Sequence, residues 1–256
     1  MANKKKPRGP KPGSGSNPTA KARPTATSSA KKPKHAARRT GPPLVFWIVI
    51  GVVVVAGVIG IVVQSSRSKT ENATVVTPKH ALGPNDTEIE GDPSAPVLVE
   101  EYGDFQCPSC RAFFDSSDAT IKQLVAAKKI RFAFGNFAFL GPESIRAASA
   151  ALCAADVGKY WEYHDLLYAN QASENSGFLT TDQLIAFGKE AGITGADLTT
   201  FESCVRSARY EGFVRKQTEK TSKDRNVTQT PTVFVNGRQL QDLSPAGLTA
   251  TVNAAT

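Results

Sequence analysis

The sequence predicts an α/β domain in which a β–α–β unit and a terminal β-hairpin are separated by a long helical segment. Three observations lead to this prediction. A strand-like run is followed by Cys107-Pro-Ser-Cys110 and a helical pattern, residues 142–225 then have helical character throughout, and Asn236-Gly237 is a strong hairpin signal. The roughly 170 residues from Pro84 onward are enough for one well-buried domain.

The β–α–β unit begins with residues 97–102, which have the composition of a short strand. A helix is expected from Cys107 to about Ala127, with Pro108 in its first turn, where the missing N–H costs nothing. Residues 130–134 alternate between faces as a second strand. This order predicts a right-handed crossover.

The helical segment from about 142 to 225 contains several successive helix patterns and no strand signal. Asp182 is expected to cap one of them. The expected helices are 142–156, 160–170, 182–191, 197–205 and 207–224. Strand character returns at 232–235 and continues after the hairpin at 238–240, and Ser244-Pro245 starts a final short helix.

The two cysteines of Cys107-Pro-Ser-Cys110 can cycle between a dithiol and a disulfide. Cys107 is expected at a helix N-terminus, where the helix dipole and unpaired N–H groups favour the thiolate, so it is predicted to be the attacking sulfur. Cys110 lies one turn deeper and is within reach as the resolving thiol. A static local disulfide is the alternative, although this spacing near a strand and a helix usually indicates redox chemistry.

A structural zinc half-site is a second alternative for the same pair. It would need two more ligands, yet Cys153 and Cys204 stand alone and the three histidines show no ligand spacing. These histidines are His35, His80 and His164. We therefore expect no metal site in this chain.

The N-terminal region predicts a membrane anchor. Residues 1–43 contain twelve Lys or Arg and no Asp or Glu, which predicts a disordered basic arm. Residues 44–63 are uncharged and, at about 1.5 Å per residue, long enough to cross a bilayer core of roughly 30 Å. A cleaved signal peptide is the alternative, but its apolar core would be shorter and no small-residue cleavage site follows Val63.

The distribution of charge predicts which side of the membrane each part occupies. The excess of cationic residues before the span places the N-terminus in the cytoplasm and the C-terminal domain outside it. Residues 64–85 are expected to form a polar linker. Residues 44–256 carry 19 basic and 23 acidic residues, a net charge of −4, so the overall charge of +8 is due to the +12 of the arm. We expect no nucleic-acid binding, because the arm lacks aromatic residues for base stacking.

Three ordered motifs carry a resemblance to a known family. They are Glu101-Tyr-Gly-Asp-Phe-Gln-Cys-Pro-Ser-Cys-Arg111, Ala150-Ala-Leu-Cys-Ala-Ala with Tyr160-Trp-Glu-Tyr-His-Asp165, and Thr230-Pro-Thr-Val-Phe-Val-Asn-Gly237. Over about residues 84–256 the chain resembles the DsbA family of thiol:disulfide oxidoreductases, in particular its membrane-anchored actinobacterial type. The resemblance implies a thioredoxin fold in residues 86–256 with a helical insertion at about 142–225.

The resemblance also implies roles for residues around the cysteines. Pro231 would be a cis-proline facing them, with the backbone of Thr230 free to bind a substrate peptide as an added strand, although a trans proline opening a strand is the alternative. Pro108 and Ser109 would also contact substrate. The oxidising members of the family carry His in this dipeptide, so the neutral Ser109 implies a less oxidising disulfide, whose potential the sequence does not fix.

Glu101 would be the buried carboxylate beneath the disulfide and would relay the proton of Cys110. By strand alternation it shares a face with Val97 and Val99, whereas Glu100 points the other way. A solvated edge carboxylate is the alternative for Glu101. His164 is an isolated helical histidine, for which we expect a packing role.

Cys153 and Cys204 are predicted to form a structural disulfide inside the helical insertion, since both occupy positions where cysteine should be buried. Two unpaired core thiols are an alternative, and so is a second redox pair, which is disfavoured because neither has a Cys-x-x-Cys partner.

The expected function is disulfide formation in exported proteins by an anchored, monomeric thiol oxidase without a cofactor. By resemblance, a vitamin K epoxide reductase-like membrane oxidase would reoxidise it. A reductase or disulfide isomerase of the same fold, and a non-catalytic peptide-binding module, are the alternatives.

Overall fold

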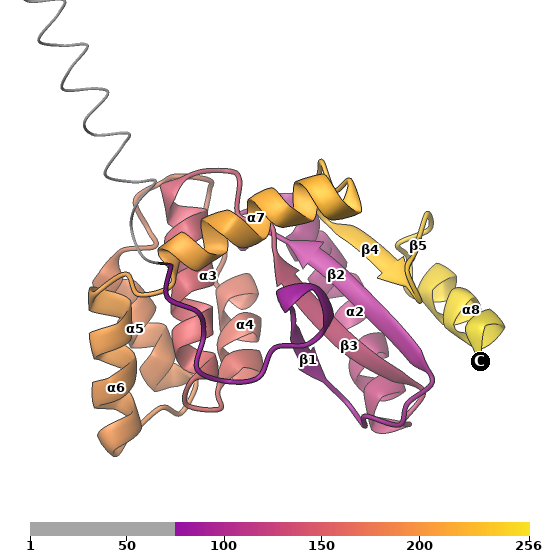
Figure 1. Ribbon diagram of the computed structural model, residues 1–256, viewed down its shortest axis with the longest axis horizontal. Coiled ribbons are helices and arrows are strands. Elements are labelled where there is room, and N and C mark those ends of the chain that lie inside the picture. Colours follow the sequence, from indigo (N-terminus) through magenta and orange to yellow (C-terminus); the bar gives the residue numbers. More distant parts are fainter. Residues whose placement is uncertain (1–74) are drawn as a thin grey trace, which may run out of the picture. The chain divides into compact units, whose positions relative to one another are not determined.

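The computed structural model describes residues 75–256 (Figure 1). Five strands form one sheet in the order β1-β3-β2-β4-β5. The strands are β1 (Glu88–Glu90), β2 (Val97–Gly103), β3 (Ile130–Asn136), β4 (Thr232–Val235) and β5 (Arg238–Gln239). The central pair β2 and β3 is parallel, and the other three pairs are antiparallel. The predicted β–α–β unit and terminal hairpin are both present.

Helices lie on both faces of this sheet and beside it (Figure 1). Helices α2 and α8 pack on one face, α3 to α6 gather at one side, and α7 crosses the other face, although the insertion predicted at about 142–225 included it. The helices are α2 (Pro108–Ala126), α3 (Pro142–Ala155), α4 (Tyr160–Ala169), α5 (Thr181–Glu190), α6 (Gly195–Arg206), α7 (Glu211–Arg225) and α8 (Pro245–Ala255), and a short 3-10 helix, η1 (Pro84–Asp86), precedes β1.

The structure differs from the sequence-based expectation in three local features. Strand β1 and η1 were not predicted, and β3 continues to Asn136. The predicted N-cap Asp182 was wrong: Thr180 is the N-cap of α5, and its side chain accepts a hydrogen bond from the Gln183 N–H at 3.1 Å. Thr180 has the extended backbone that a capping residue needs, whereas Asp182 lies inside the first turn.

Two hydrophobic clusters meet near the cysteine motif. One fills the space between the sheet, α2 and α8, and the other fills the helical insertion. Cys107 and Cys110 belong to the second cluster, together with Phe105 and Phe134 from the sheet side. Helix α2 therefore spans both clusters, which fixes its N-terminal turn against the insertion and its body against the sheet.

The predicted basic arm (1–43), the predicted membrane helix (44–63) and residues 64–74 of the predicted linker lie outside the described residues. Between residues 75 and 256, none of the helices combines the length and the apolar character needed to cross a membrane. The described end of the linker lies on the domain. His80 contacts the Glu88 carboxylate at 2.6 Å and the Asp156 carboxylate at 3.1 Å, and Leu82 packs against the core of the insertion.

Candidate active site

Cys107 is the N-cap residue of α2, at the point where the chain leaves β2 and enters the helix. Its side chain is mostly buried, and its Sγ donates a hydrogen bond to the backbone oxygen of Thr230 at 3.4 Å. Cys110 lies one turn further and is fully buried. The two sulfurs are free thiols in this structure, so the site is described in its reduced form.

The two thiols differ sharply in acidity. A hydrogen bond from Cys110 is the main cause that lowers the pKa of Cys107 to about 6, with smaller contributions from the Thr230 side chain and from the N–H groups of Cys110 and Ser109 acting against the effect of burial. Burial, the hydrogen bond to Cys107 and the nearby Glu101 charge raise the pKa of Cys110 far above its ordinary value. Near neutral pH Cys107 is therefore a thiolate and Cys110 a thiol.

Glu101 lies in β2, paired with Phe134 of β3 and Val233 of β4. Its side chain is 4% exposed, and its Oε1 has no hydrogen-bond partner among the described residues. Burial, together with the negative charges of Cys107 and Asp118, raises the pKa of Glu101 to about 8. The carboxyl group is thus able to gain or lose a proton in the pH range of thiol chemistry.

Replacing Glu101 by Gln is expected to stabilise the reduced protein above neutral pH. The pKa of Glu101 is about 8 in the folded protein, against an ordinary 4.5. The neutral carboxyl group is therefore tolerated at low pH, and Glu101 lowers the unfolding free energy progressively as the pH rises from 4.5 to 8, because its ionisation then favours the unfolded chain. Denaturant unfolding at pH 5 and pH 8.5 measures the effect. The gain in unfolding free energy should be a few kcal/mol at pH 8.5 and much smaller at pH 5; an equal gain at both pH values would contradict a neutral, buried Glu101.

Thr230 and Pro231 face the cysteines from the loop before β4. Their peptide bond is cis. Pro231 and Ser109 lie on a surface groove of about 360 Å³ that runs between α2 and the start of α8. The groove is lined by Ser109, Ala112, Phe113, Ser116, Pro231, Leu243, Ser244 and Pro245. Pro108 and Ser109 are exposed at the mouth of this groove.

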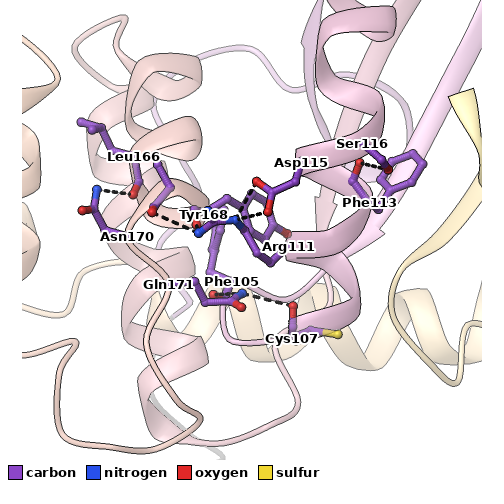
Figure 2. Close-up of polar contacts among 11 residues, drawn as sticks. Phe105, Cys107, Arg111, Phe113, Asp115, Ser116, Leu166, Tyr168, Asn170 and Gln171 are labelled. Atoms are coloured by element: carbon purple, nitrogen blue, oxygen red, sulfur yellow. Dashed lines mark hydrogen bonds and ion pairs between the residues drawn. The ribbon is translucent and has the colours of Figure 1, made fainter.

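Gln171 and Arg111 hold the first turn of α2 against α4, and sequence reasoning did not identify either (Figure 2). The Gln171 side-chain amide donates to the carbonyl oxygens of Phe105 at 2.9 Å and Cys107 at 3.1 Å. Arg111 pairs with Asp115 at 2.7 Å and donates to carbonyl oxygens at the end of α4. Arg111 ends the first of the three family motifs, but its role was not identified, because its contacts with α4 and those of Gln171 with residues 105 and 107 join segments far apart in the sequence.

Asp104 organises the loop between β2 and Cys107. Its buried carboxylate accepts hydrogen bonds from the N–H groups of Gln106 at 2.9 Å, Phe139 at 3.0 Å and Leu140 at 3.1 Å. The turn from Asp104 to Gln106 is a local Asx pattern that the sequence could have indicated. The contacts to residues 139 and 140 depend on tertiary structure.

Glu100 is also buried, on the opposite face of β2 from Glu101. Its carboxylate accepts hydrogen bonds from Arg225 Nη2 at 2.9 Å and Asn85 Nδ2 at 2.7 Å. The Arg225 guanidinium also stacks on the Phe234 ring, 4.4 Å from its centre. Arg225 ends α7 and Phe234 lies in β4, so these contacts hold together the two ends of the loop that carries Thr230 and Pro231.

Replacing Arg225 by Gln is expected to lower the unfolding free energy by about 2 kcal/mol, because it leaves the buried Glu100 carboxylate without its cation. Arg215→Gln is the matched control on the same helix. Arg215 is exposed and its nearest Glu211 oxygen is 3.6 Å away, so this change should cost less than about 0.5 kcal/mol. Similar losses in both variants, measured by urea unfolding, would contradict a stabilising Glu100–Arg225 pair.

Cys153 of α3 and Cys204 of α6 form a disulfide inside the helical insertion, with their Cα atoms 5.8 Å apart. Both residues are buried. Across residues 75–256 no group of three potential metal-binding side chains comes together. In the described part of the chain, the cysteine motif combines the Cys107 thiol, whose pKa is lowered, with the buried carboxyl group of Glu101 and the surface groove lined by Ser109 and Pro231.

The comparisons with known proteins agree with this geometry. The family model described as thioredoxin matches residues 85–254. A probable disulfide bond formation protein D of Bacillus cereus is 29% identical over 196 residues, which cover 73% of this chain and 84% of the relative.

Two solved structures extend the comparison. BdbD of Bacillus subtilis, in its oxidised form, matches with a TM-score of 0.59 and 25% identity over 66% of this chain and 92% of that one. Reduced DsbA of Mycobacterium tuberculosis matches with a TM-score of 0.56 and 27% identity over 71% and 90%. The predicted mixed α/β thioredoxin-like fold and the predicted enzyme class are confirmed. The chain belongs to the thioredoxin family, and within it to the DsbA-like thiol-disulfide oxidoreductases.

Proposed function

We propose that this enzyme is a dithiol oxidase that forms disulfides in reduced exported proteins. A substrate thiolate attacks the Cys107 sulfur of the Cys107–Cys110 disulfide, and Cys110 leaves as a thiolate that takes a proton from Glu101. A second substrate thiolate then attacks the substrate sulfur of the mixed disulfide and releases Cys107. The substrate loses two electrons, and the enzyme is left as a Cys107 thiolate and a Cys110 thiol.

The observation that supports this direction most directly is the lowered pKa of Cys107, about 6. At pH 7 most Cys107 is then ionised in the reduced enzyme, and the interactions that favour the thiolate exist only in that form. Stabilising the reduced form makes the disulfide a stronger oxidant. Hydrogen bonds from Cys110, from the Thr230 side chain and from the backbone N–H groups of Ser109 and Cys110 supply this stabilisation here, without a histidine in the Pro108-Ser109 dipeptide.

The groove beside Pro231 supports substrate binding at the same place. Its walls combine Phe113, Leu243 and two prolines with the hydroxyls of serines, which suits an unfolded chain that presents apolar side chains. We propose that substrate contacts Pro108, Ser109, Thr230 and Pro231 while its cysteine reacts with Cys107. The part of the groove between α2 and α8 would hold residues that flank that cysteine.

The same proposal covers the location and the redox partner. The uncharged segment 44–63 would anchor the enzyme in the cell membrane with the basic arm in the cytoplasm and the catalytic domain outside. A membrane oxidase resembling vitamin K epoxide reductase would accept the two electrons of Cys107 and Cys110 and pass them to a quinone.

The redox state of the enzyme in its own cells tests the direction of electron flow. Cells are quenched in acid, free thiols are alkylated with a reagent that adds mass, and the enzyme is resolved by gel mobility. An oxidase should carry Cys107 and Cys110 mainly as a disulfide, and removal of the membrane oxidase should convert it to the dithiol. A predominant dithiol in untreated cells would contradict the oxidase proposal and favour a reductase or isomerase.

A further inference from the structure

A line of buried polar groups runs along one face of α4, behind the active site. Tyr160, His164 and Tyr168 are spaced four residues apart, so they share that face. All three are buried, and each has a polar atom without a hydrogen-bond partner among the described residues: the two tyrosine hydroxyls and His164 Nε2. Glu101 Oε1 shares this property. Buried polar atoms in folded proteins are rarely left unpaired, so this group calls for an explanation.

These groups lie close to one another and to the strand residue that pairs with Glu101. The His164 ring centre is 6.1 Å from that of Tyr160 and 5.0 Å from that of Tyr168. It is also 4.7 Å from the ring centre of Phe134, the β3 neighbour of Glu101. Burial is the main cause that raises the pKa of both tyrosines, and the Glu101 charge adds to it in each case. His164 thus lies between two tyrosines, Tyr160 and Tyr168, whose pKa values are raised in part by the charge of Glu101.

The other side of His164 leads to the surface. Its Nδ1 is 3.0 Å from Asp165 Oδ1, and the side chain of Asp165 is 31% exposed. Asp165 also accepts a hydrogen bond from Lys122 of α2 at 2.6 Å, and Lys122 pairs with Asp118 at 2.9 Å. His164 therefore has one ring nitrogen in the buried interior and the other against a group that meets water.

Reoxidation of the enzyme requires a path by which a proton can travel from the buried Glu101 to solvent. When the enzyme is reoxidised, Cys107 is held in a mixed disulfide with the partner, and Cys110 must lose its proton to Glu101 before its thiolate attacks Cys107. The partner sulfur leaves as a thiolate. Glu101 is buried, and the partner covers the cysteine face at that moment, so the proton needs another way to solvent.

We propose that His164 carries protons between Glu101 and Asp165, which connects the buried carboxyl group to solvent on the side away from the substrate. This inference rests on the proposed role of Glu101 in the oxidase reaction. Nε2 receives the proton that Glu101 gives up, while the proton on Nδ1 passes to Asp165, so the imidazole ends each transfer neutral after its tautomer resets. The reverse sequence supplies Glu101 with the proton that Cys110 takes during substrate oxidation.

The titratable and charged groups around this path come from four elements. They are Glu88 and Glu90 of β1, Glu101 of β2, Cys110, Asp118 and Lys122 of α2, and Tyr160, Asp165 and Tyr168 of α4. Lys122 holds Asp165 and Asp118 together, and both carboxylates are partly exposed. His164 differs from the tyrosines of this set because an imidazole ring has two nitrogens, one of which can accept a proton while the other donates one.

A two-step reaction of the purified full-length enzyme with oxidised glutathione separates the two thiols. Cys107 of the reduced enzyme first attacks glutathione disulfide, and Cys110 then resolves the mixed disulfide. Acid quenching and mass spectrometry follow both steps. In His164→Gln the first rate should be unchanged and the second should fall by about 10²-fold at pH 7, because only the second requires the Cys110 proton to leave. Added imidazole should restore part of the second rate.

Two further variants decide between a relay and a packing role. Tyr163→Phe is the matched control, since Tyr163 lies on another face of α4 and its hydroxyl donates to the Leu184 oxygen at 2.9 Å. It should lower stability and leave both rates unchanged. Asp165→Asn, at the exposed end of the path, should slow only the resolving step, and it decides the outcome if His164→Gln does not fold.

Unchanged resolution in His164→Gln and Asp165→Asn at every pH would overturn the relay. A loss in both steps without rescue by imidazole would assign His164 to packing and would also overturn it. Wild-type enzyme that forms no Cys107–glutathione disulfide would instead contradict the proposed function itself.

Discussion

Cys107→Ser should lose its oxidase activity, by about 10³-fold or more, and should form no mixed disulfide with substrate. The structure assigns it the only lowered thiol pKa among the described cysteines that titrate, and its Sγ lies beside Thr230 at the groove. Loss of a covalent nucleophile removes the reaction path and not merely a binding contact. Activity is measured as the rate of disulfide formation in a reduced, unfolded secreted protein.

Cys110→Ser is the matched variant, and unlike Cys107→Ser it should still form a mixed disulfide with substrate. Substrate can still react at Cys107, but no resolving thiol is present, so mixed disulfides at Cys107 should accumulate and be seen on non-reducing gels. The rate at which Cys107 of this variant is alkylated should rise with pH as its thiol ionises and then level off. Accumulation in Cys107→Ser but not in Cys110→Ser would reverse the assignment of nucleophile and resolving thiol.

The fold was predictable because its signals are local. Cys107-Pro-Ser-Cys110 opens a helix after a strand, and Asn236-Gly237 closes a hairpin, so the order of elements could be inferred without tertiary information. Strand β1 was missed because its three residues, Glu88–Glu90, carry two charges and gain their strand character only by pairing with β3. Their burial depends on the helices that pack beside them.

The reacting cysteines of the site could be predicted from the sequence, whereas most of the residues that hold them in place could not. The resemblance suggested the role of Glu101 and strand alternation favoured its burial, but neither gave Glu100 a role, because its partner Arg225 lies 125 residues away. Gln171 was missed for the same reason: the side chain that donates to the Cys107 carbonyl oxygen lies just after α4, 64 residues away in the sequence. Sequence patterns locate the reacting groups, whereas the residues that position them are fixed by contacts between distant segments.

The second large effect concerns the disulfide in the insertion. The double variant Cys153→Ala, Cys204→Ala should lose about 4 kcal/mol of unfolding free energy, since the bond closes a loop with a sequence separation of 51 residues. For a domain of this size the melting temperature should fall by roughly 8–16 °C. Oxidase activity below the new transition should remain near the wild-type value, because the contacts that hold Cys107 come from Gln171 and Thr230 and not from this disulfide.

Selective reduction separates the two cysteine pairs in the same protein. Cys107 adjoins the exposed Pro108 and Ser109, whereas Cys153 and Cys204 are buried between α3 and α6. Mild dithiothreitol should therefore reduce an oxidised active site first, and Cys153 and Cys204 should resist alkylation until the domain unfolds. A double variant that keeps its melting temperature and loses activity would show that this disulfide serves the reaction and not the fold. In that case the helical insertion would have to be regarded as part of the redox machinery, since α3 and α4 together form the wall behind Cys110.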